Sequence, residues 1–267
     1  MAAYTGRERM TMRVLSVGDV VSETGLRFLQ KKLRGLIRLT GADFTVVNGE
    51  NACGTGILPR QAEEILDAGA DLITLGNHGF RRKEIFPYLD DEKCILRPLN
   101  YAPQVPGRGW AEVDTRFGPL LAVNLIGRCG MDFGPDNPFH AIDRLMKERE
   151  YRFLLVDFHA EATSEKLAMG FHLDGRASAL WGTHTHVQTS DAMVLPKGTG
   201  YITDLGMTGP AISVLGVRPE QSVRMFLGDP PAPYAAASGP AKLECALFTL
   251  DDATGLCTSA EALRIEE

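Results

Sequence analysis

Short apolar runs alternate with helix-like segments along the first half of the chain. Residues 12–17, 44–47 and 71–75 are runs of this kind, and the segments between them place apolar residues three and four positions apart. This alternation constrains the chain to an α/β core, because parallel strands need crossover connections, usually helices, which cover the sheet. Later strands are expected to add a second sheet.

Local signals mark where several of these elements begin and end. Ser22 is positioned to cap the first helix, Gly41 to end it, and Pro59 suits the first turn of the next helix. Residues 110–114 and 120–125 read as two strands of a hairpin. We find no repeat and no convincing linker, so we expect a polar tail over residues 1–11 and a single domain over residues 12–267.

Composition excludes several classes of protein. The formal net charge of −6 argues against general nucleic-acid binding, and no apolar run reaches the roughly 18 residues that a membrane span requires. The five cysteines form no CxxC pair and are odd in number, which fits a reducing compartment better than a disulfide framework. The first dozen residues carry no apolar stretch typical of a signal peptide. We therefore expect a cytoplasmic protein.

The stretch Trp181-Gly182-Thr183-His184-Thr185-His186 follows an apolar run and suggests a strand that ends in a loop. In extended backbone, side chains two residues apart point the same way, so the two histidines are expected to converge there. Converging imidazoles can hold a metal ion. An isolated pair of this kind is more often structural, so the interpretation depends on what else in the chain meets it.

Polar groups with the right chemistry follow five predicted strands. They are Asp19, Glu50, Asn51, Asn77, His78, His159, His184 and His186. Each alone is explained by the turn chemistry of strand ends. In open α/β sheets, however, the functional site lies outside the carboxyl ends of the strands, where all eight would meet.

Nitrogen and carboxylate donors without thiolates suit iron, manganese or zinc better than calcium. Seven or eight donors are too many for one tetrahedral zinc ion. They fit two metal ions roughly 3.5–4 Å apart, an arrangement used in phosphate ester chemistry.

The motifs resemble those of calcineurin-like metallophosphoesterases, and more closely those of the YmdB-like bacterial family of 2′,3′-cyclic-nucleotide 2′-phosphodiesterases. The matching segments are Gly18-Asp19-Val20-Val21, Val47-Asn48-Gly49-Glu50-Asn51, Gly76-Asn77-His78, Arg97-Pro98-Leu99-Asn100-Tyr101, the stretch from Val156 to Lys166, the stretch from Gly182 to Thr189, and the stretch from Thr203 to Gly209. This resemblance implies an α/β fold, an α+β four-layer sandwich in which two mixed β-sheets pack together and are flanked by helices.

The resemblance also implies a division of the ligands between two divalent or trivalent ions, with iron as the first expectation and manganese or another transition metal as alternatives. One ion would be held by Asp19, Glu50, Asn51 and His186, and the other by Glu50, Asn77, His159 and His184. Glu50 would bridge the two ions. The chain departs from the general superfamily at Val21, where most members carry a histidine.

The implied activity is hydrolysis of cyclic nucleotides, most directly of 2′,3′-cyclic nucleotides to 3′-monophosphates, by attack of a metal-activated hydroxide. His78 is the expected catalytic residue, either as proton donor to the leaving oxygen or as a hydrogen-bond stabiliser of the transition state. The alternatives are a phosphomonoesterase or protein phosphatase, and a non-catalytic, metal-dependent nucleotide-binding regulator. The sequence leaves open whether the chain forms a homo-oligomer and which residues bind the substrate.

Four further residues keep two interpretations each. Arg97 and Tyr101 fit either contact with a phosphate or base, or the anchoring of a loop. Glu161 and Lys166 fit either capping of the following helix, or contacts with the substrate or behind the site.

Overall fold

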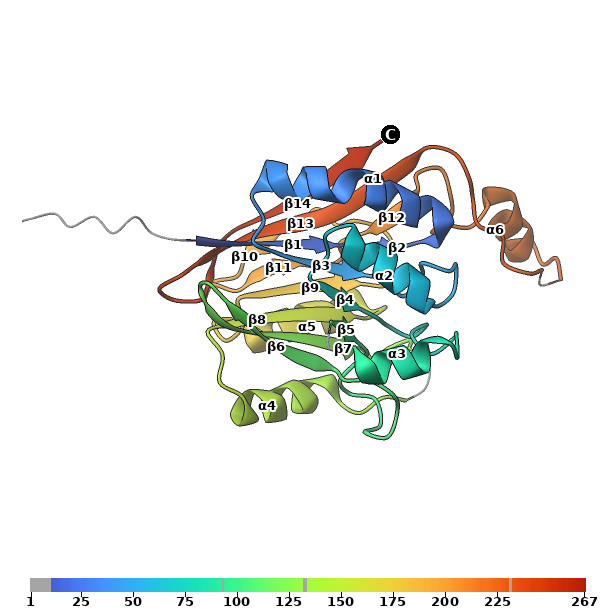
Figure 1. Cartoon of the computed structure of the whole chain (residues 1–267). Coiled ribbons are helices and arrows are strands. Elements are labelled where there is room, and N and C mark those ends of the chain that lie inside the picture. Colours follow the sequence, from blue (N-terminus) through green and yellow to red (C-terminus); the bar gives the residue numbers. More distant parts are fainter. Residues whose placement is uncertain (1–10, 93, 132–133, 231) are drawn as a thin grey trace, which may run out of the picture.

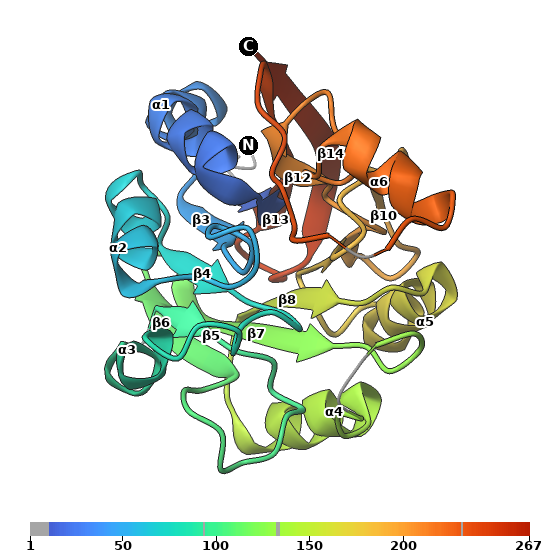
Figure 2. The same cartoon turned by 90° about the vertical axis from the view of Figure 1, so that its right-hand side faces the viewer.

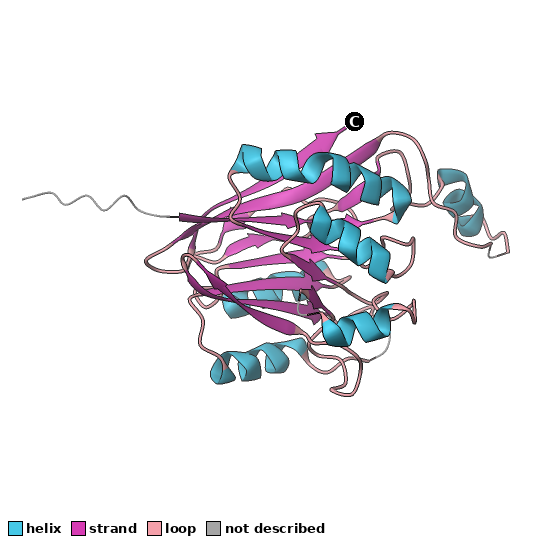
Figure 3. Ribbon diagram, viewed as in Figure 1, coloured by secondary structure: helices cyan, strands magenta, loops and turns pink. Residues whose placement is uncertain are grey.

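The computed structural model describes residues 11–92, 94–131, 134–230 and 232–267. Two mixed β-sheets pack face to face, and helices cover their outer faces (Figures 1 and 3). The order of layers is helix, sheet, sheet, helix. This confirms the predicted α/β four-layer architecture.

The first sheet has eight strands, in the order β2-β12-β13-β1-β3-β4-β5, with β14 on the far edge of β13. Its strands are β1 (Thr11–Val17), β2 (Asp19–Val20), β3 (Phe44–Asn48), β4 (Leu72–Thr74), β5 (Ile95–Leu96), β12 (Met207–Pro210), β13 (Ala241–Asp251) and β14 (Cys257–Glu266). Strands β1, β3, β4 and β5 are parallel, whereas β13 runs antiparallel to β1.

The second sheet has six strands, in the order β10-β11-β9-β8-β7-β6. Its strands are β6 (Trp110–Thr115), β7 (Gly118–Ile126), β8 (Phe153–His159), β9 (Ala179–Thr183), β10 (Met193–Val194) and β11 (Gly200–Ile202). The four central strands are parallel, and the outer strands β6 and β10 pair antiparallel with their neighbours. β8 is buried along its whole length because both faces of this sheet are covered.

The six helices of the described chain are α1 (Ser22–Thr40), α2 (Pro59–Asp67), α3 (Ile85–Asp91), α4 (Pro138–Glu148), α5 (Thr163–Leu173) and α6 (Pro219–Phe226). Helices α1, α2 and α3 cover the first sheet, and α4 and α5 cover the second (Figure 2). Helix α6 lies beyond the edge where the parallel strands end (Figure 1).

Three apolar cores hold these layers together. One lies between the first sheet and its helices, one between the second sheet and its helices, and one between the sheets. In the central core, the Trp181 ring stacks on that of Phe248 at 5.8 Å between centroids. The central core contains side chains from both sheets and therefore holds the sheets face to face. The parallel strands of both sheets end on the same side of the molecule.

The structure corrects three local predictions. Ser22 begins α1 with φ of 62° but makes no capping hydrogen bond. The later strands β6 to β11 form the expected second sheet, but the last two strands, β13 and β14, return to the first sheet. Thr11 pairs with Asp251, so β1 begins one residue inside the predicted tail, whose residues 1–10 lie outside the described part of the chain.

The parallel strands of both sheets end at one edge of the molecule. Their arrowheads point to the right in Figure 1, and this edge faces the viewer in Figure 2. None of the helices in the described ranges is long and apolar enough to cross a membrane. The predicted site residues follow these strand ends, so the fold brings them to a shared edge.

Candidate metal centre

Five strand ends supply the eight predicted site residues. Asp19 follows β1, Glu50 and Asn51 follow β3, Asn77 and His78 follow β4, His159 is the last residue of β8, and His184 and His186 follow β9. Of these strands, β1, β3 and β4 belong to the first sheet, and β8 and β9 to the second. The site therefore lies across the junction of the two sheets, where seven of the residues meet in two contacting groups and His78 lies beside Glu50 and Asn51.

The first group is centred on the fully buried His159. Its Nε2 lies 3.1 Å from Glu50 Oε1, 2.9 Å from Asn77 Oδ1 and 3.1 Å from His184 Nδ1. Ligand atoms of Glu50, His159 and His184 all lie within 4.8 Å of one another. Three acceptor atoms thus surround one ring nitrogen, which is the arrangement that a cation between them would satisfy.

The second group is centred on the carboxylate of Asp19. His186 Nε2 lies 3.6 Å from Asp19 Oδ1 and 3.3 Å from Asn51 Nδ2, and the His184 backbone N–H donates to Asp19 Oδ2 at 3.2 Å. Asn51 Nδ2 also donates to Glu50 Oε1 at 3.3 Å. Glu50 therefore contacts both groups.

The electrostatics of the site follow from burial and from close opposite charges. Burial opposes the charged form of His159, but the adjacent Glu50 outweighs it and raises the pKa of His159 to about 9. Burial and the neighbouring His159 lower the pKa of His184 to about 4. Burial would raise the pKa of Asp19, yet contact with His186 holds it well below its ordinary value. In the metal-free site, the proton on Nε2 of His159 therefore lies among acceptor atoms of Glu50, Asn77 and His184.

The donor set suits transition metals. Asp19 Oδ1 is fully buried and has no hydrogen-bond partner among the described residues, although an unpaired buried oxygen is costly. Carboxylate, amide and imidazole donors from Asp19, Glu50, Asn51, Asn77 and the three histidines are ligands that iron, manganese and zinc accept. These residues could therefore hold metal ions, with Asp19 Oδ1 as an otherwise unexplained ligand atom.

His184 and His186 converge for a reason that differs from the predicted one. The strand β9 ends at Thr183, and His184 and His186 have φ of 102° and 61°. Both residues are therefore outside extended backbone, and positive φ is uncommon for residues other than glycine. The expectation that strand alternation aligns them was wrong. A tight left-handed loop brings them together instead.

A buried ion pair supports this loop. Lys166 Nζ lies 2.6 Å from Asp204 Oδ2, and each side chain is 1% exposed. The same Asp204 oxygen accepts from the backbone N–H of Thr185 at 3.2 Å and from its hydroxyl at 2.7 Å. Thr185 lies between His184 and His186 in the sequence, so its bonds to Asp204 hold the strained segment in place. Lys166 in turn holds Asp204.

A second network orients His159. Its Nδ1 lies 2.9 Å from Thr183 Oγ1, and that hydroxyl donates to Asp157 Oδ1 at 2.7 Å. Hydrogen bonds to the other ring nitrogen commonly set the orientation of a metal-binding histidine. Asp157 therefore acts on the His159 ring through the hydroxyl of Thr183. Gly76 is also required here, since a Cβ at this position would lie 2.3 Å from His159 Nε2.

Contacts with residues outside the predicted set complete the site. Glu161 Oε2 lies 3.0 Å from His184 Nε2, and the Leu215 carbonyl lies 3.0 Å from His186 Nδ1. Tyr234 lines the pocket of about 270 Å³ above the candidate ligands. Glu161 lies two residues after His159, which is a usable sequence signal. Leu215 and Tyr234 lie far from the predicted site residues in the sequence, and no sequence signal pointed to them.

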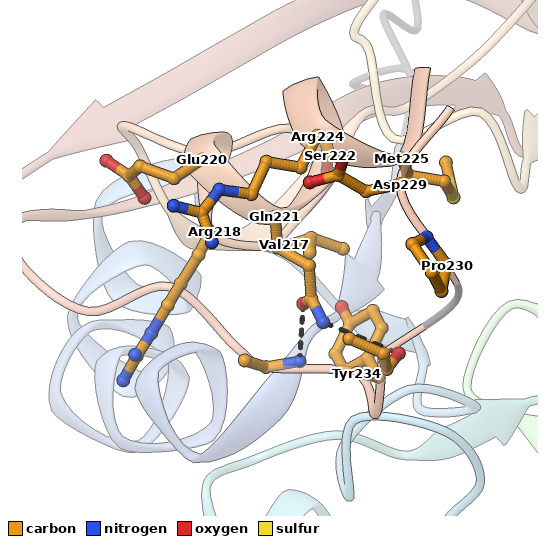
Figure 4. Close-up of a pocket in the computed structure, with 12 residues that line it drawn as sticks. Val217, Arg218, Glu220, Gln221, Ser222, Arg224, Met225, Asp229, Pro230 and Tyr234 are labelled. Carbon is orange, nitrogen blue, oxygen red and sulfur yellow. Dashed lines mark hydrogen bonds between the residues drawn. The ribbon is translucent and has the colours of Figure 1, made fainter. Parts of the chain in front are cut away.

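A larger pocket of about 680 Å³ adjoins this one below α6 and shares Val217 and Tyr234 with it. Figure 4 shows Gln221 of α6 directed at the returning segment, where it accepts from the Ala235 N–H at 2.9 Å and donates to the Pro233 carbonyl. These bonds hold the α6 segment in a closed loop next to the centre.

Known proteins share this chain's sequence and fold. The family model described as YmdB-like protein matches residues 15–263. A 2′,3′-cyclic-nucleotide 2′-phosphodiesterase of Bacillus subtilis (strain 168) is 41% identical, over 96% of this chain and 98% of that protein.

Two crystal structures are also similar. A hypothetical protein from Thermus thermophilus has a TM-score of 0.90 and 43% identity, with 96% of this chain and 100% of that chain covered. A structure described as a novel phosphatase, from Mycoplasma pneumoniae, has a TM-score of 0.92 and 33% identity, with 97% and 95% covered. The chain therefore belongs to the YmdB-like protein family, as its motifs predicted.

Proposed function

We propose that this chain is a metal-dependent phosphodiesterase that hydrolyses 2′,3′-cyclic nucleotides to 3′-monophosphates. Membership of its family makes it a phosphoesterase, because the relatives that cover nearly the whole chain are a 2′,3′-cyclic-nucleotide 2′-phosphodiesterase and a phosphatase. The observation that carries the finer proposal is the buried Asp19 Oδ1, to which no described residue donates a hydrogen bond, beside two contacting groups of nitrogen and oxygen donors.

The two groups correspond to two metal positions that share Glu50. Asp19, Asn51 and His186 would hold one ion, and Asn77, His159 and His184 the other, with iron or manganese as the metals that these donors favour. Two ions held there would supply an activated water and would neutralise charge on the phosphoryl oxygens. Glu50 is buried and contacts both groups, which supports the bridging role proposed for it.

The surroundings of His78 support a role for it at the leaving oxygen. Its Nδ1 lies 2.7 Å from Asn51 Oδ1, and its backbone N–H donates to Glu50 Oε2 at 2.9 Å. Asn51 thereby fixes the ring, and the side chain lines the pocket above the centre. As the P–O2′ bond breaks and water oxygen bonds to phosphorus, the departing O2′ needs a proton. We assign its delivery to His78.

Substitution of His78 separates this role from metal binding. His78→Ala is expected to keep its metal content and to lose roughly 10²–10⁴ in kcat, the usual contribution of a general acid. Metal analysis and steady-state kinetics on the same preparation measure both. Wild-type kcat in His78→Ala would remove His78 from the reaction.

The proposed function is tested on a panel of esters. Purified protein of known metal content is incubated with 2′,3′-cyclic AMP, 3′,5′-cyclic AMP and 4-nitrophenyl phosphate, alongside Glu50→Ala. Turnover of the 2′,3′-cyclic substrate to the 3′-monophosphate, lost in Glu50→Ala, is the expected result. Preference for the monoester would indicate a phosphomonoesterase, and a metal-free, inactive wild type would overturn the proposal.

A further inference from the structure

A third pocket borders the candidate centre at Asn77 and extends to α3. Its volume is about 650 Å³, within the range typical of small-molecule sites. It is lined by Asn77, which contacts His159 in the centre, and by three aromatic side chains, Phe80, Phe86 and Tyr101. The pocket above the centre is smaller, about 270 Å³, and Tyr234 is the one aromatic residue besides histidines that the structure gives for its lining.

The aromatic side chains form one connected group. The ring centroids of Phe80 and Tyr101 lie 5.7 Å apart at 51°, and those of Phe80 and Phe86 lie 5.7 Å apart at 78°. Phe80 and Phe86 also pack against the core below α1, α2 and α3. Tyr101 lies outside the three cores and is partly exposed at the pocket. Its ring is thus supported from one side by Phe80.

The backbone that carries Tyr101 is fixed before any ligand arrives. The buried Arg97 side chain donates to the carbonyls of Pro98 at 2.7 Å and Leu99 at 3.1 Å. Asn100 donates to the carbonyls of Ile126 and Asp136, each at 2.8 Å. Arg97 is therefore a loop anchor, one of its two expected roles. A rigid ring loses little entropy when it stacks on a ligand.

We propose that this aromatic pocket binds the nucleobase of the substrate while the cyclic phosphate lies at the metal centre. The proposal rests on the proposed function and adds the part of the substrate that the centre does not touch. Asn77 connects the two regions, because it lines the pocket and contacts the centre. A planar heteroaromatic ring is the partner that a supported tyrosine face recognises, whatever the base.

The experiment compares two cyclic esters that differ only in the base. The ratio of kcat/KM for 2′,3′-cyclic AMP to kcat/KM for methyl riboside 2,3-cyclic phosphate is measured for the wild type and variants. Tyr101→Ala is expected to lower this ratio about 5- to 150-fold, mainly through KM, because stacking of a base on an aromatic ring contributes about 1–3 kcal/mol. Tyr101→Phe keeps the ring and is expected to retain the ratio.

Two further variants separate stacking from general damage. Ala102→Trp fills the pocket from an exposed position and is expected to lower the ratio as Tyr101→Ala does. Met225→Ala alters only the pocket below α6 and is expected to leave the ratio at the wild-type value. A wild-type ratio in both Tyr101→Ala and Ala102→Trp, or an equal fall in Met225→Ala, would overturn the inference.

A binding measurement keeps the inference separate from the reaction. Calorimetric titration of the metal-loaded protein with adenosine 3′-monophosphate and with inorganic phosphate measures what the nucleoside adds. The nucleotide is expected to bind at least about tenfold more tightly in the wild type, and Tyr101→Ala to remove this difference. If the wild type hydrolyses neither cyclic ester, the proposed function fails, but this titration still decides the pocket. Equal affinities in the wild type would refute it.

Discussion

Replacement of Lys166 by Met tests whether a buried ion pair supports the loop that carries His184 and His186. The change removes the ammonium group and retains an unbranched side chain of similar length. Asp204 then keeps its charge while 1% exposed and loses a partner 2.6 Å away. Removing one member of a buried ion pair typically costs about 3–5 kcal/mol, because the remaining charge is uncompensated. For a chain of 267 residues this corresponds to a fall in Tm of roughly 6–20 °C.

The measurement is urea unfolding of metal-free wild type and variant, since bound metal would itself stabilise the folded state. A second substitution, Asp204→Asn in the Lys166→Met background, removes the uncompensated charge and leaves an amide oxygen for Thr185. It is expected to recover more than half of the lost free energy. A loss below about 1 kcal/mol in Lys166→Met, or no recovery in the double variant, would refute the reasoning from burial.

Three other predictions follow from the centre and the central core. Gly76→Ala places a Cβ 2.3 Å from His159 Nε2 and 2.5 Å from Glu50 Oε2. Metal affinity, measured by metal titration, is therefore expected to fall at least about tenfold. An affinity equal to that of the wild type would show that the site can widen. The pKa of His159 is raised to about 9 in the metal-free protein, so this ring is protonated at pH 7 and must lose its proton to bind a metal. Metal affinity is therefore expected to rise from pH 6 to pH 9 with proton release, measured by calorimetry in buffers of different ionisation enthalpy; pH-independent affinity would contradict the assignment. Trp181→Ala empties the core between the sheets and is expected to cost about 3–5 kcal/mol of unfolding free energy, whereas a cost below about 1 kcal/mol would mean that Trp181 contributes little to that contact.

Much of this protein is determined by its local sequence. The spacing of Leu26 to Ile37 marks α1, Gly41 ends it in the left-handed conformation with φ of 64°, and Pro59 begins α2. The residue types that follow the strands also indicate which metals the site could bind. Carboxylates, amides and imidazoles without thiolates favour iron, manganese or zinc over calcium. These features are readable since periodicity, helix ends and side-chain chemistry depend on residues near in sequence.

The tertiary structure decided how these pieces meet. β13 pairs with both β1 and β12, although it comes more than 200 residues after β1, because strand partners are selected by which faces can be buried together. Sequence spacing could not assign His159 and His184 to one contacting group and Asp19 and His186 to another. The same holds for the left-handed loop of His184, which depends on Asp204, and for the pocket at Tyr101. Such contacts arise from packing between distant segments, and no local pattern encodes them.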